Sequence, residues 1–377
     1  MEDEIIKEIE DDQKQREKIL SPYATKNEDG ERYFPFKEDI RPPFWRDADR
    51  IIHSLSYNRY SDKTQVFSFN DNDHLSRRMT HVQMVSKVAR MIGRCLKLNE
   101  DLIEAAALGH DIGHTPLGHV GEALLNEISE RELGEYFNHN VQSFRTFMYL
   151  DRGGDGSNLN VQVLDAVLCH NGEFLSNKYY PRKKTKEQLL KDYQDAYTVK
   201  DMSKRLVPMT LEGCVVRISD IIGYIGRDVE DAIMIGAIKR SDVPKEIIDV
   251  LGTKNGEIID SIILDIVTHS YGKPYIEMSE EVFNAMMSLK KFNKEHIYSK
   301  ANTPEEIEYY RKGFNLLYDK YLNDIETDNK ESEIYKDFLK DKKPIYLDNT
   351  NHKRMVIDFL AGMTDEYFHK QYEELIK

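Results

Sequence analysis

Six of the twelve histidines lie within 66 residues of one another, and carboxylates accompany them. The strongest element is the adjacent pair His110 and Asp111, which ends an apolar helix predicted over 101–112. Near a helix end, adjacent side chains can converge on one ion. Imidazole and carboxylate together suit a divalent metal such as Mn, Fe, Co, Ni or Zn, with Mg at the harder end. The histidines are His74, His81, His110, His114, His119 and His139.

Two further candidate ligands come from helices before and after this pair. His81 shares one predicted helical face with Val85 and Ile92, so we expect it to point into the protein. In the helix predicted over 211–235, one polar stripe interrupts an apolar surface, and burying it unpaired costs several kcal/mol per ion. A cation beside Asp220 removes that cost. The stripe consists of Arg217, Asp220, Tyr224, Asp228 and Asp231.

A candidate proton-transfer pair follows the His-Asp pair. Thr115 and Pro116 predict the start of a helix. On that helix His119 and Glu122 are three residues apart and share a face. Because a neighbouring carboxylate raises the basicity of an imidazole and orients it, this pair suits proton transfer.

Each of these features also has an ordinary structural explanation. A single histidine on an apolar helix face is most often a packed core residue, and an acidic helical stripe is usually solvated. The succession of a histidine, a His-Asp pair and an aspartate on separate helices favours a metal site over these explanations.

The elements that must position these residues are predicted to be helical. Between Asp47 and about Ile238, apolar residues recur at steps of three and four, while alternation typical of strands is scarce. We therefore predict an all-α protein. Residues 1–45 form a predicted N-terminal helix and irregular arm, 46–240 the core, and 241–377 a C-terminal helical region packed on the core.

Composition excludes several classes of protein. Lys and Arg number 53 against 67 Asp and Glu, which gives a net charge of −14 and argues against charge-driven nucleic-acid binding. No apolar stretch approaches the roughly 18 residues of a spanning helix, so we expect no membrane association. The three cysteines are far apart and the N-terminus is acidic, so the sequence predicts neither a disulfide framework nor a leader. We expect a cytoplasmic protein.

The chain resembles the HD-domain deoxynucleoside triphosphate triphosphohydrolases, the dGTPase-like family, over about 46–235. The plain HD pattern is common to many phosphohydrolases, whereas the blocks from His110 to Glu122 and from Lys63 to Phe67 are much narrower. The matching motifs are Arg46-Asp-Ala-Asp-Arg-Ile-Ile-His53, Lys63-Thr-Gln-Val-Phe67, Arg78-Met-Thr-His81, Leu108-Gly-His-Asp-Ile-Gly-His-Thr-Pro-Leu-Gly-His-Val-Gly-Glu122, Phe137-Asn-His-Asn140, His170-Asn-Gly172, Asp220-Ile-Ile-Gly-Tyr224 and Arg227-Asp-Val-Glu-Asp231.

The resemblance implies an HD-domain helical fold at 46–240 with additional C-terminal helices, and it implies roles for individual residues. It implies that His119 and Glu122 carry proton transfer and that His114 contacts the phosphates. Gln65 is expected under the 3′-hydroxyl, where with Val66 it excludes a ribose 2′-hydroxyl. The ligands of one divalent ion are expected to be His81, His110, Asp111 and Asp220. The expected substrate contacts are Gln65, Val66, Arg78, Tyr224, Asp228 and His139.

The implied reaction is hydrolysis of dGTP, or of several dNTPs, at the α-phosphorus to a deoxynucleoside and inorganic tripolyphosphate. The basic region over 176–208 is a candidate clamp for the triphosphate. From the resemblance we expect a homo-oligomer, from dimer to hexamer, an activating nucleotide at a subunit interface, and nucleic acid as an accessory ligand at most. Two alternatives stay open: an HD phosphohydrolase acting on a nucleoside monophosphate or a guanosine alarmone, and a non-catalytic nucleotide sensor.

Overall fold

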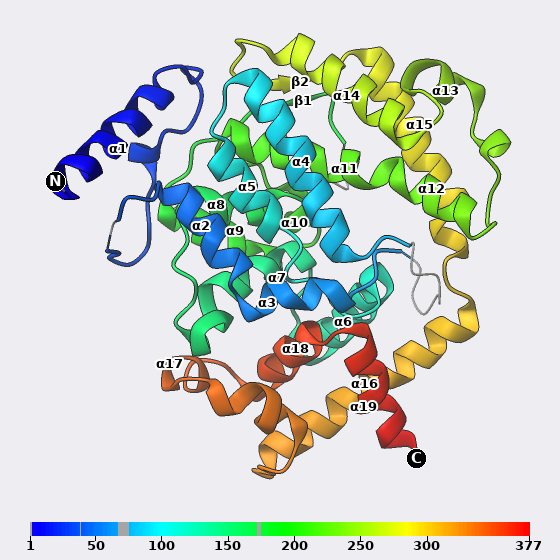
Figure 1. Ribbon diagram of the computed structural model, residues 1–377. Helices are drawn as coiled ribbons and strands as arrows, with labels where there is room; N and C mark the ends of the chain where they lie inside the picture. Colours follow the sequence, from blue (N-terminus) through cyan, green and yellow to red (C-terminus); the bar gives the residue numbers. More distant parts are fainter. Residues whose placement is uncertain (1, 38, 67–74, 172–174) are drawn as a thin grey trace.

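The computed structural model describes residues 2–37, 39–66, 75–171 and 175–377 (Figure 1). Three residues quoted above, Phe67, His74 and Gly172, lie outside the described residues. The described chain is mostly helical, with a short antiparallel pair of strands formed by β1 (Lys178–Tyr179) and β2 (Ile276–Glu277). The all-α prediction is therefore confirmed.

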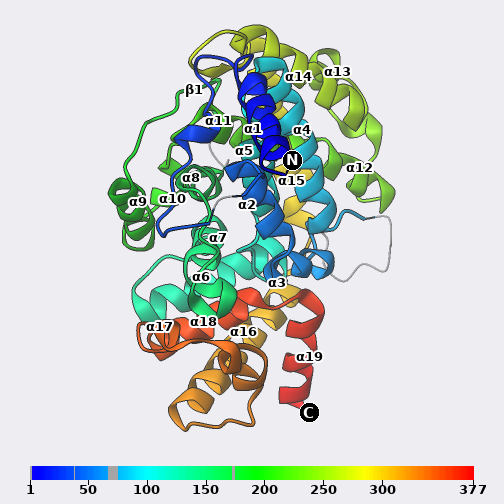
Figure 2. The same cartoon turned by 60° about the vertical axis from the view of Figure 1, so that its left-hand side comes forward.

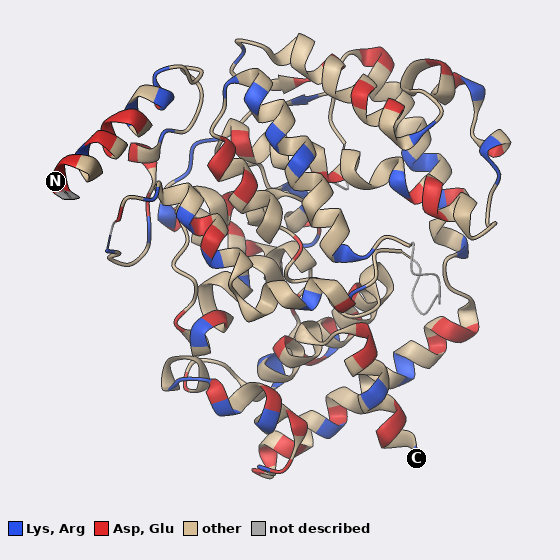
Figure 3. Cartoon of the chain, in the orientation of Figure 1, with Lys and Arg blue, Asp and Glu red and all other residues tan. Residues whose placement is uncertain are grey.

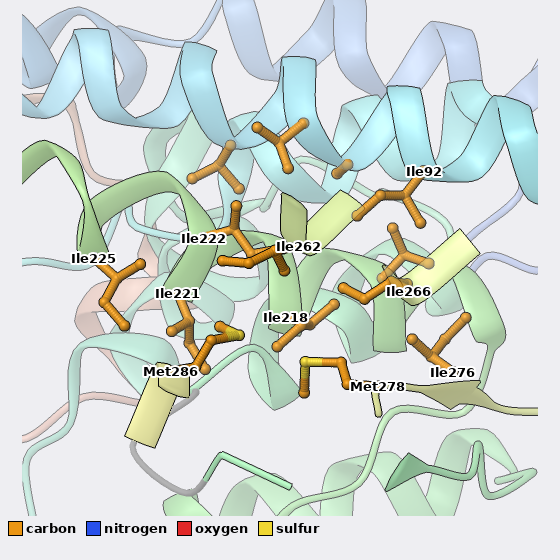
Figure 4. Close-up of a cluster of buried hydrophobic side chains, with 14 of the residues drawn as sticks. Ile92, Ile218, Ile221, Ile222, Ile225, Ile262, Ile266, Ile276, Met278 and Met286 are labelled. Atoms are coloured by element: carbon orange, nitrogen blue, oxygen red, sulfur yellow. The ribbon is translucent and has the colours of Figure 1, made fainter. Parts of the chain in front are cut away.

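The core is a layer of apolar helices around α11. In Figure 4, Ile218 and Ile222 of α11 lie beside Ile262 and Ile266 of α14, with Ile92 of α4 above them. These side chains are fully buried, which removes their apolar surface from water. The helices of this layer are α4 (Arg78–Leu96), α5 (Glu100–Gly109), α8 (Val161–Cys169), α11 (Leu211–Ile225), α14 (Asn255–Ser270) and α15 (Glu280–His296). A further helix, α2 (Pro43–Ile52), packs on α5.

Side-chain caps fix where two of these helices begin. Asn99 Oδ1 accepts hydrogen bonds from the backbone N–H groups of Asp101 and Leu102 at the start of α5. Thr210 Oγ1 accepts one from the N–H of Gly213 at the start of α11. The caps set the register of both helices, and that register decides which side chains their ends and inner faces present to the interior.

A second apolar cluster joins α6 to the C-terminal helices. Leu125 of α6 is buried with Phe314 and Tyr321 of α16 and Leu360 of α18. Figure 2 shows α16, α18 and α19 lying together below α2 and α3. The helices of this part are α6 (Gly118–Leu133), α16 (Pro304–Glu326), α17 (Pro344–Leu347), α18 (His352–Gly362) and α19 (Asp365–Ile376). The others are α1 (Glu2–Glu17), α3 (Leu55–Asn58), α7 (His139–Arg145), α9 (Lys186–Thr198), α10 (Met202–Arg205), α12 (Arg227–Met234) and α13 (Lys245–Leu251).

Three predicted helix boundaries are wrong. The helix predicted over 101–112 ends at Gly109, so His110 and Asp111 directly follow it. The helix predicted to start at Thr115 and Pro116 begins only at Gly118, because Leu117 adopts a left-handed conformation with φ 64°. The helix predicted over 211–235 is interrupted at Gly226, where α11 ends and α12 follows. The polar stripe of that prediction is therefore divided between two helices.

Acidic and basic residues alternate over the outer helices, and acidic residues gather along α1 (Figure 3). Within the described ranges, no helix is both long and apolar enough to cross a bilayer.

Candidate metal centre and nucleotide cavity

The four predicted metal ligands converge from three places in the fold. His81 Nε2 lies 3.0 Å from Asp220 Oδ1 and 3.8 Å from Asp111 Oδ2. His110 Nε2 lies 3.5 Å from Asp111 Oδ1 and 3.6 Å from Asp220 Oδ1. Ligands held about 2.1 Å from one ion are separated by distances of this size. We call these four residues the metal cluster.

The residues present fit a divalent metal. His110 Nδ1 donates a hydrogen bond to the carbonyl oxygen of Ala107 at 2.7 Å, so the proton lies on Nδ1 and the lone pair on Nε2. That Nε2 atom is buried and has no hydrogen-bond partner among the described residues. A metal-binding histidine is commonly held through one ring nitrogen, which leaves the lone pair of the other nitrogen for the ion. His110 has this arrangement, and its Nε2 atom faces the carboxylates of Asp111 and Asp220.

The electrostatics of the cluster keep both acids ionised. Burial raises the pKa of Asp220, but the neighbouring imidazoles of His110 and His81 outweigh it and lower that pKa. Burial likewise raises the pKa of Asp111, and the neighbouring histidines and Arg78 outweigh it and hold the pKa well below its usual range. Arg78 Nη1 donates to Asp111 Oδ2, so one carboxylate oxygen is held by a cation and Oδ1 is left toward the histidines.

Glu122 holds two imidazoles. Its Oε1 accepts hydrogen bonds from His139 N–H at 2.7 Å and from His139 Nδ1 at 2.8 Å, while its Oε2 lies 3.4 Å from His119 Nδ1. The His119 side chain is 74% exposed and that of His139 is 10% exposed. Burial lowers the pKa of His139, but Glu122 outweighs it and raises the pKa to about 9. The predicted pair of His119 and Glu122 is therefore part of a set of three residues that includes His139. Of the two histidines, the buried His139 lies closer to the Glu122 carboxylate.

Two further histidines complete the buried group. The His114 ring stacks on His139 with centroids 4.0 Å apart, and burial with the charges of Arg78 and His139 lowers its pKa well below the usual value. His170 Nε2 lies 3.1 Å from His139 Nε2 and 3.6 Å from Asp111 Oδ1. Sequence reasoning quoted His170 only as part of a motif. Its position directly after an apolar helix, like that of His110, was the available signal.

One cavity of about 480 Å³ collects most of the predicted site residues. Sequence reasoning did not single out several other residues along its wall, among them Asn126, Lys290 and Tyr298. The predicted residues that line it are Gln65, Val66, Arg78, His81, Asp111, His114, His119, Glu122, His139, Asp220, Tyr224 and Asp228. His110 lies behind this wall, fully buried.

Two predicted substrate contacts lie at this wall with distinct polar surroundings. Gln65 Oε1 is buried without a hydrogen-bond partner in the part of the chain that the structure describes. Asp228 Oδ2 accepts a hydrogen bond from Tyr298 Oη at 2.6 Å, and burial raises the pKa of Asp228 to about 7. Tyr298 is 70 residues further along the chain, in a region whose sequence pattern indicated no chemistry.

The C-terminal helices hold two segments of the cavity wall. Asp365, in the first turn of α19, accepts hydrogen bonds through Oδ2 from Thr64 N–H at 2.9 Å and Thr64 Oγ1 at 2.7 Å. Its Oδ1 accepts one from Leu117 N–H at 2.8 Å. The buried Lys63 Nζ donates to the carbonyl oxygens of His114 and, at 3.1 Å, Ala361. The segment before Gln65 and the start of α6 are therefore tied to one carboxylate.

The predicted basic clamp over 176–208 is largely engaged elsewhere. Lys184 Nζ lies 2.7 Å from Asp165 and 3.0 Å from Asp192, and Lys178 pairs with Glu277 at 3.0 Å. In the described part of this region, the cations at the cavity wall are Lys200 and Lys204. Arg217, from the predicted polar stripe, donates to the carbonyl oxygens of Leu206 and Lys204 and takes no part in the metal cluster.

Comparison with known proteins places these residues in two family regions. The HD domain model matches residues 78–223, which include the metal cluster, and the phosphohydrolase-associated domain model matches 276–374, which include Tyr298 and Asp365. The chain is 37% identical over 364 residues to a deoxyguanosinetriphosphate triphosphohydrolase-like protein of Caldanaerobacter subterraneus, covering 95% of this chain and 92% of that protein. A protein of Clostridium tetani with the same description is 36% identical over 92% of this chain and 90% of its own length.

Proposed function

Because this chain belongs to the deoxyguanosinetriphosphate triphosphohydrolase-like family of HD-domain phosphohydrolases, we propose that it hydrolyses deoxynucleoside triphosphates at the α-phosphorus. The products are a deoxynucleoside and inorganic tripolyphosphate, and the substrate is dGTP or several dNTPs. The hydrolysis depends on a divalent metal ion.

One observation carries this proposal. Three members of the metal cluster, His81, Asp111 and Asp220, border the same cavity of about 480 Å³ as Gln65 and Val66, the residues expected at the sugar. A triphosphate brings several negative charges, and the same wall includes Arg78, Lys200 and Lys204. Positioning and charge stabilisation are what phosphoryl transfer requires of a protein, so this arrangement supports a nucleoside triphosphate as the occupant.

The metal cluster would hold the ion, which when bound supplies Lewis acidity toward phosphate oxygens and water. Arg78, fixed on Asp111, offers its guanidinium to a non-bridging phosphate oxygen. The neutral His114 offers a buried Nδ1 that has no hydrogen-bond partner among the described residues. Both side chains are held in place before a substrate enters, which spares reorganisation during the reaction.

Proton transfer is assigned to His119 and Glu122. Glu122 is fixed by His139, and its second oxygen faces His119 Nδ1, which leaves His119 Nε2 for a substrate or water. In this position His119 can take a proton from the attacking water or give one to the leaving 5′-oxygen. Since the His119 side chain is largely exposed, it can exchange that proton with solvent between turnovers.

A screen of the four dNTPs in Mg²⁺ and in Mn²⁺ tests the proposal, with products separated by chromatography. We expect deoxynucleoside and tripolyphosphate in equal amounts from at least one dNTP, and none from His110→Ala. His269→Ala, in α14, is the matched histidine control and should keep full activity. A deoxynucleoside monophosphate as product, or undiminished tripolyphosphate release by His110→Ala, would contradict the proposal.

The same experiment separates the alternatives. An HD phosphohydrolase for a nucleoside monophosphate or a guanosine alarmone would leave dNTPs intact. A nucleotide sensor would gain thermal stability from a dNTP and give no product over hours.

We also propose that the protein forms a homo-oligomer, from dimer to hexamer, and that a second nucleotide activates it. Light scattering tests the assembly. Repeating the screen with a second dNTP present tests the activation.

A further inference from the structure

A second cavity, of about 600 Å³, lies between the HD core and the C-terminal helices. Residues of α3, of the segment 150–157 and of the end of α18 line it. Among the described residues, none lines both this cavity and the one of about 480 Å³ beside the metal cluster, which we call the nucleotide cavity. The volume is in the range of sites for small molecules. Its arginine and lysine residues are Arg50, Arg59, Arg152 and Lys342, and we call it the arginine cavity.

The Arg59 guanidinium has no charge partner. Its Nε atom is buried without a hydrogen-bond acceptor, and no carboxylate in the described ranges forms an ion pair with it. The guanidinium lies against Gly362 at the end of α18, and burial lowers the pKa of Arg59. Because burying an unpaired cation is costly, the packing of the chain alone does not account for an arginine at this position.

The other cations of the arginine cavity are also unpaired. Arg50 Nε is buried without a hydrogen-bond partner, and burial together with the charge of Arg152 lowers the pKa of Arg50 to about 10. Arg152 itself is exposed at the cavity wall. Lys342 Nζ donates to the carbonyl oxygen of Leu150 at 2.6 Å, which carries no charge. Within the part of the chain that the structure describes, none of these cations forms an ion pair.

The two buried acids of the wall are engaged by other groups. Asp151 accepts hydrogen bonds from Ser56 Oγ at 2.8 Å and from Ser157 Oγ at 2.7 Å. Asp358 accepts two from the guanidinium of Arg145, both at 2.7 Å. The remaining acids of the wall, both exposed, are Asp337 and Asp341. The buried arginine donors therefore find their acceptors in a ligand or in water.

Several cations around one cavity match a ligand with several negatively charged oxygens. Guanidinium groups bind phosphate oxygens through paired, charge-assisted hydrogen bonds. A single carboxylate would satisfy one arginine, whereas a chain of phosphates offers oxygens to more than one. We propose that the arginine cavity binds an oligophosphate, supplied either as free tripolyphosphate or as the phosphate chain of a nucleotide. The competing occupant is ordered water.

The arginine cavity shares a wall with the nucleotide cavity. Ile112 and Gly113 line the first, and His114, which directly follows them, lines the second. Lys63 Nζ donates to the carbonyl oxygens of His114 and, at 3.1 Å, of Ala361, which lines the arginine cavity. A ligand in the arginine cavity would therefore contact the wall that fixes His114.

Titration calorimetry tests the site on the full-length protein, stripped of metal and kept in EDTA. Because the cations of the nucleotide cavity also attract phosphates, we expect the wild type to bind two tripolyphosphate molecules per protomer. Arg59→Met should weaken one of the two binding events by at least about 10-fold, since it removes charge-assisted hydrogen bonds. Arg94→Met, at an exposed arginine of α4, should leave both events unchanged. Binding to Arg59→Met that equals binding to the wild type, in number and affinity, would overturn the proposal.

The melting temperature separates a ligand site from a structural role. Without ligand, Arg59→Met should melt at a higher temperature than the wild type, because it removes an unpaired cation. With tripolyphosphate the wild type should gain more than the variant, since only the wild type binds at both cavities. A variant that melts at a lower temperature and gains as much as the wild type would show that Arg59 serves only the fold.

A second titration, with dGTP in EDTA, distinguishes the two sources of the phosphates. An event that depends on Arg59 with tripolyphosphate assigns the free anion, and one seen with dGTP alone assigns a nucleotide. No such event with either compound would overturn the proposal. Metal-free crystals of the wild type grown with the compound that binds should show phosphate density beside Arg59, and water alone at that place would contradict it. None of these readouts involves catalysis, so binding without dNTP hydrolysis would refute only the proposed function.

Discussion

Glu122 and His139, which are 17 residues apart in the chain, form a closer pair than Glu122 and His119, which share one helical turn. The Glu122 carboxylate takes both the backbone N–H and the Nδ1–H of His139 at 2.7 and 2.8 Å, against 3.4 Å to His119 Nδ1. Burial raises the pKa of Glu122, but His139 and His119 outweigh it and hold that pKa well below its usual range. The Glu122 carboxylate is therefore ionised and fixed by His139, and in this fixed position it orients the exposed imidazole of His119.

Replacing His119 should separate chemistry from stability. We expect His119→Asn to lower kcat for dNTP hydrolysis by about 100-fold or more, because it removes the proton-transfer group. The melting temperature and the metal content should stay unchanged, since the side chain is largely exposed. Glu122→Gln is the contrasting variant and should lower kcat and the melting temperature together, because it breaks a buried pair. A kcat for His119→Asn within twofold of the wild type would remove His119 from the mechanism.

Gln65 is predicted to decide between deoxyribose and ribose. Its Oε1 atom is buried at the cavity wall. We expect the Gln65 side chain to fill the space beside the sugar and so to exclude a 2′-hydroxyl. Gln65→Ala should lower the ratio of kcat/KM for dGTP over GTP by at least about 10-fold, since steric exclusion is lost. The ratio is measured by competition between the two nucleotides. An unchanged ratio would favour a substrate that is not selected by its sugar.

Asp365 is predicted to act as a positioning residue from the C-terminal helices. Asp365→Ala removes the acceptor of three hydrogen bonds, two from Thr64 and one from Leu117. We expect a loss of unfolding free energy on the order of 3 kcal/mol, since bonds to a charged acceptor are strong. We also expect a lower dGTP-to-GTP ratio, because Gln65 follows Thr64.

The neighbouring exposed acid provides the control. Glu366→Ala should change neither the stability nor the ratio. A variant at Asp365 that is less stable but keeps the full ratio would show a purely structural role. Restoration of the ratio by Asp365→Asn, which keeps one acceptor oxygen, would support positioning.

Asp228 makes stability depend on pH. Burial raises its pKa from 3.8 to about 7 in the folded protein. Between about pH 4 and pH 7 the folded state holds a proton that the unfolded state has released, so stability falls as pH rises through this window. The loss is complete above pH 7 and amounts to on the order of 4 kcal/mol.

Asp228→Asn removes this titration. The variant should therefore gain stability relative to the wild type as pH rises from 5 to 8, as measured by urea unfolding with a chelator present. Asp249→Asn, at an exposed acid of α13, should show no such trend. A constant difference between Asp228→Asn and the wild type across this range would contradict the assigned pKa.

Local patterns predicted the helical character of the chain and the four residues that the structure brings together in the metal cluster. His81 and Asp220 lie on helical faces whose apolar periodicity is readable in the sequence, and His110 with Asp111 follows an apolar run. Their geometry follows once α4, α5 and α11 pack against each other. The start of α6 was mispredicted because Thr115 and Pro116 carry a cap signal, while the tertiary bond from Leu117 to Asp365 sets the actual boundary.

Contacts between distant parts of the chain could not be predicted. The bond between Thr64 and Asp365 joins residues 301 apart, and that between Asp228 and Tyr298 joins residues 70 apart. Neither Tyr298 nor Asp365 stands out by type or spacing, since tyrosine and aspartate are common on solvated helices. Their importance comes only from the packing of the C-terminal helices on the core.

The position of bond cleavage tests the central claim most directly. The wild-type protein is incubated with dGTP and Mn²⁺ in water enriched in ¹⁸O, and each product is analysed by mass spectrometry. Attack at the α-phosphorus predicts one ¹⁸O atom in tripolyphosphate and none in deoxyguanosine. Label in deoxyguanosine, or label in orthophosphate or pyrophosphate accompanied by a phosphorylated nucleoside, would contradict the account.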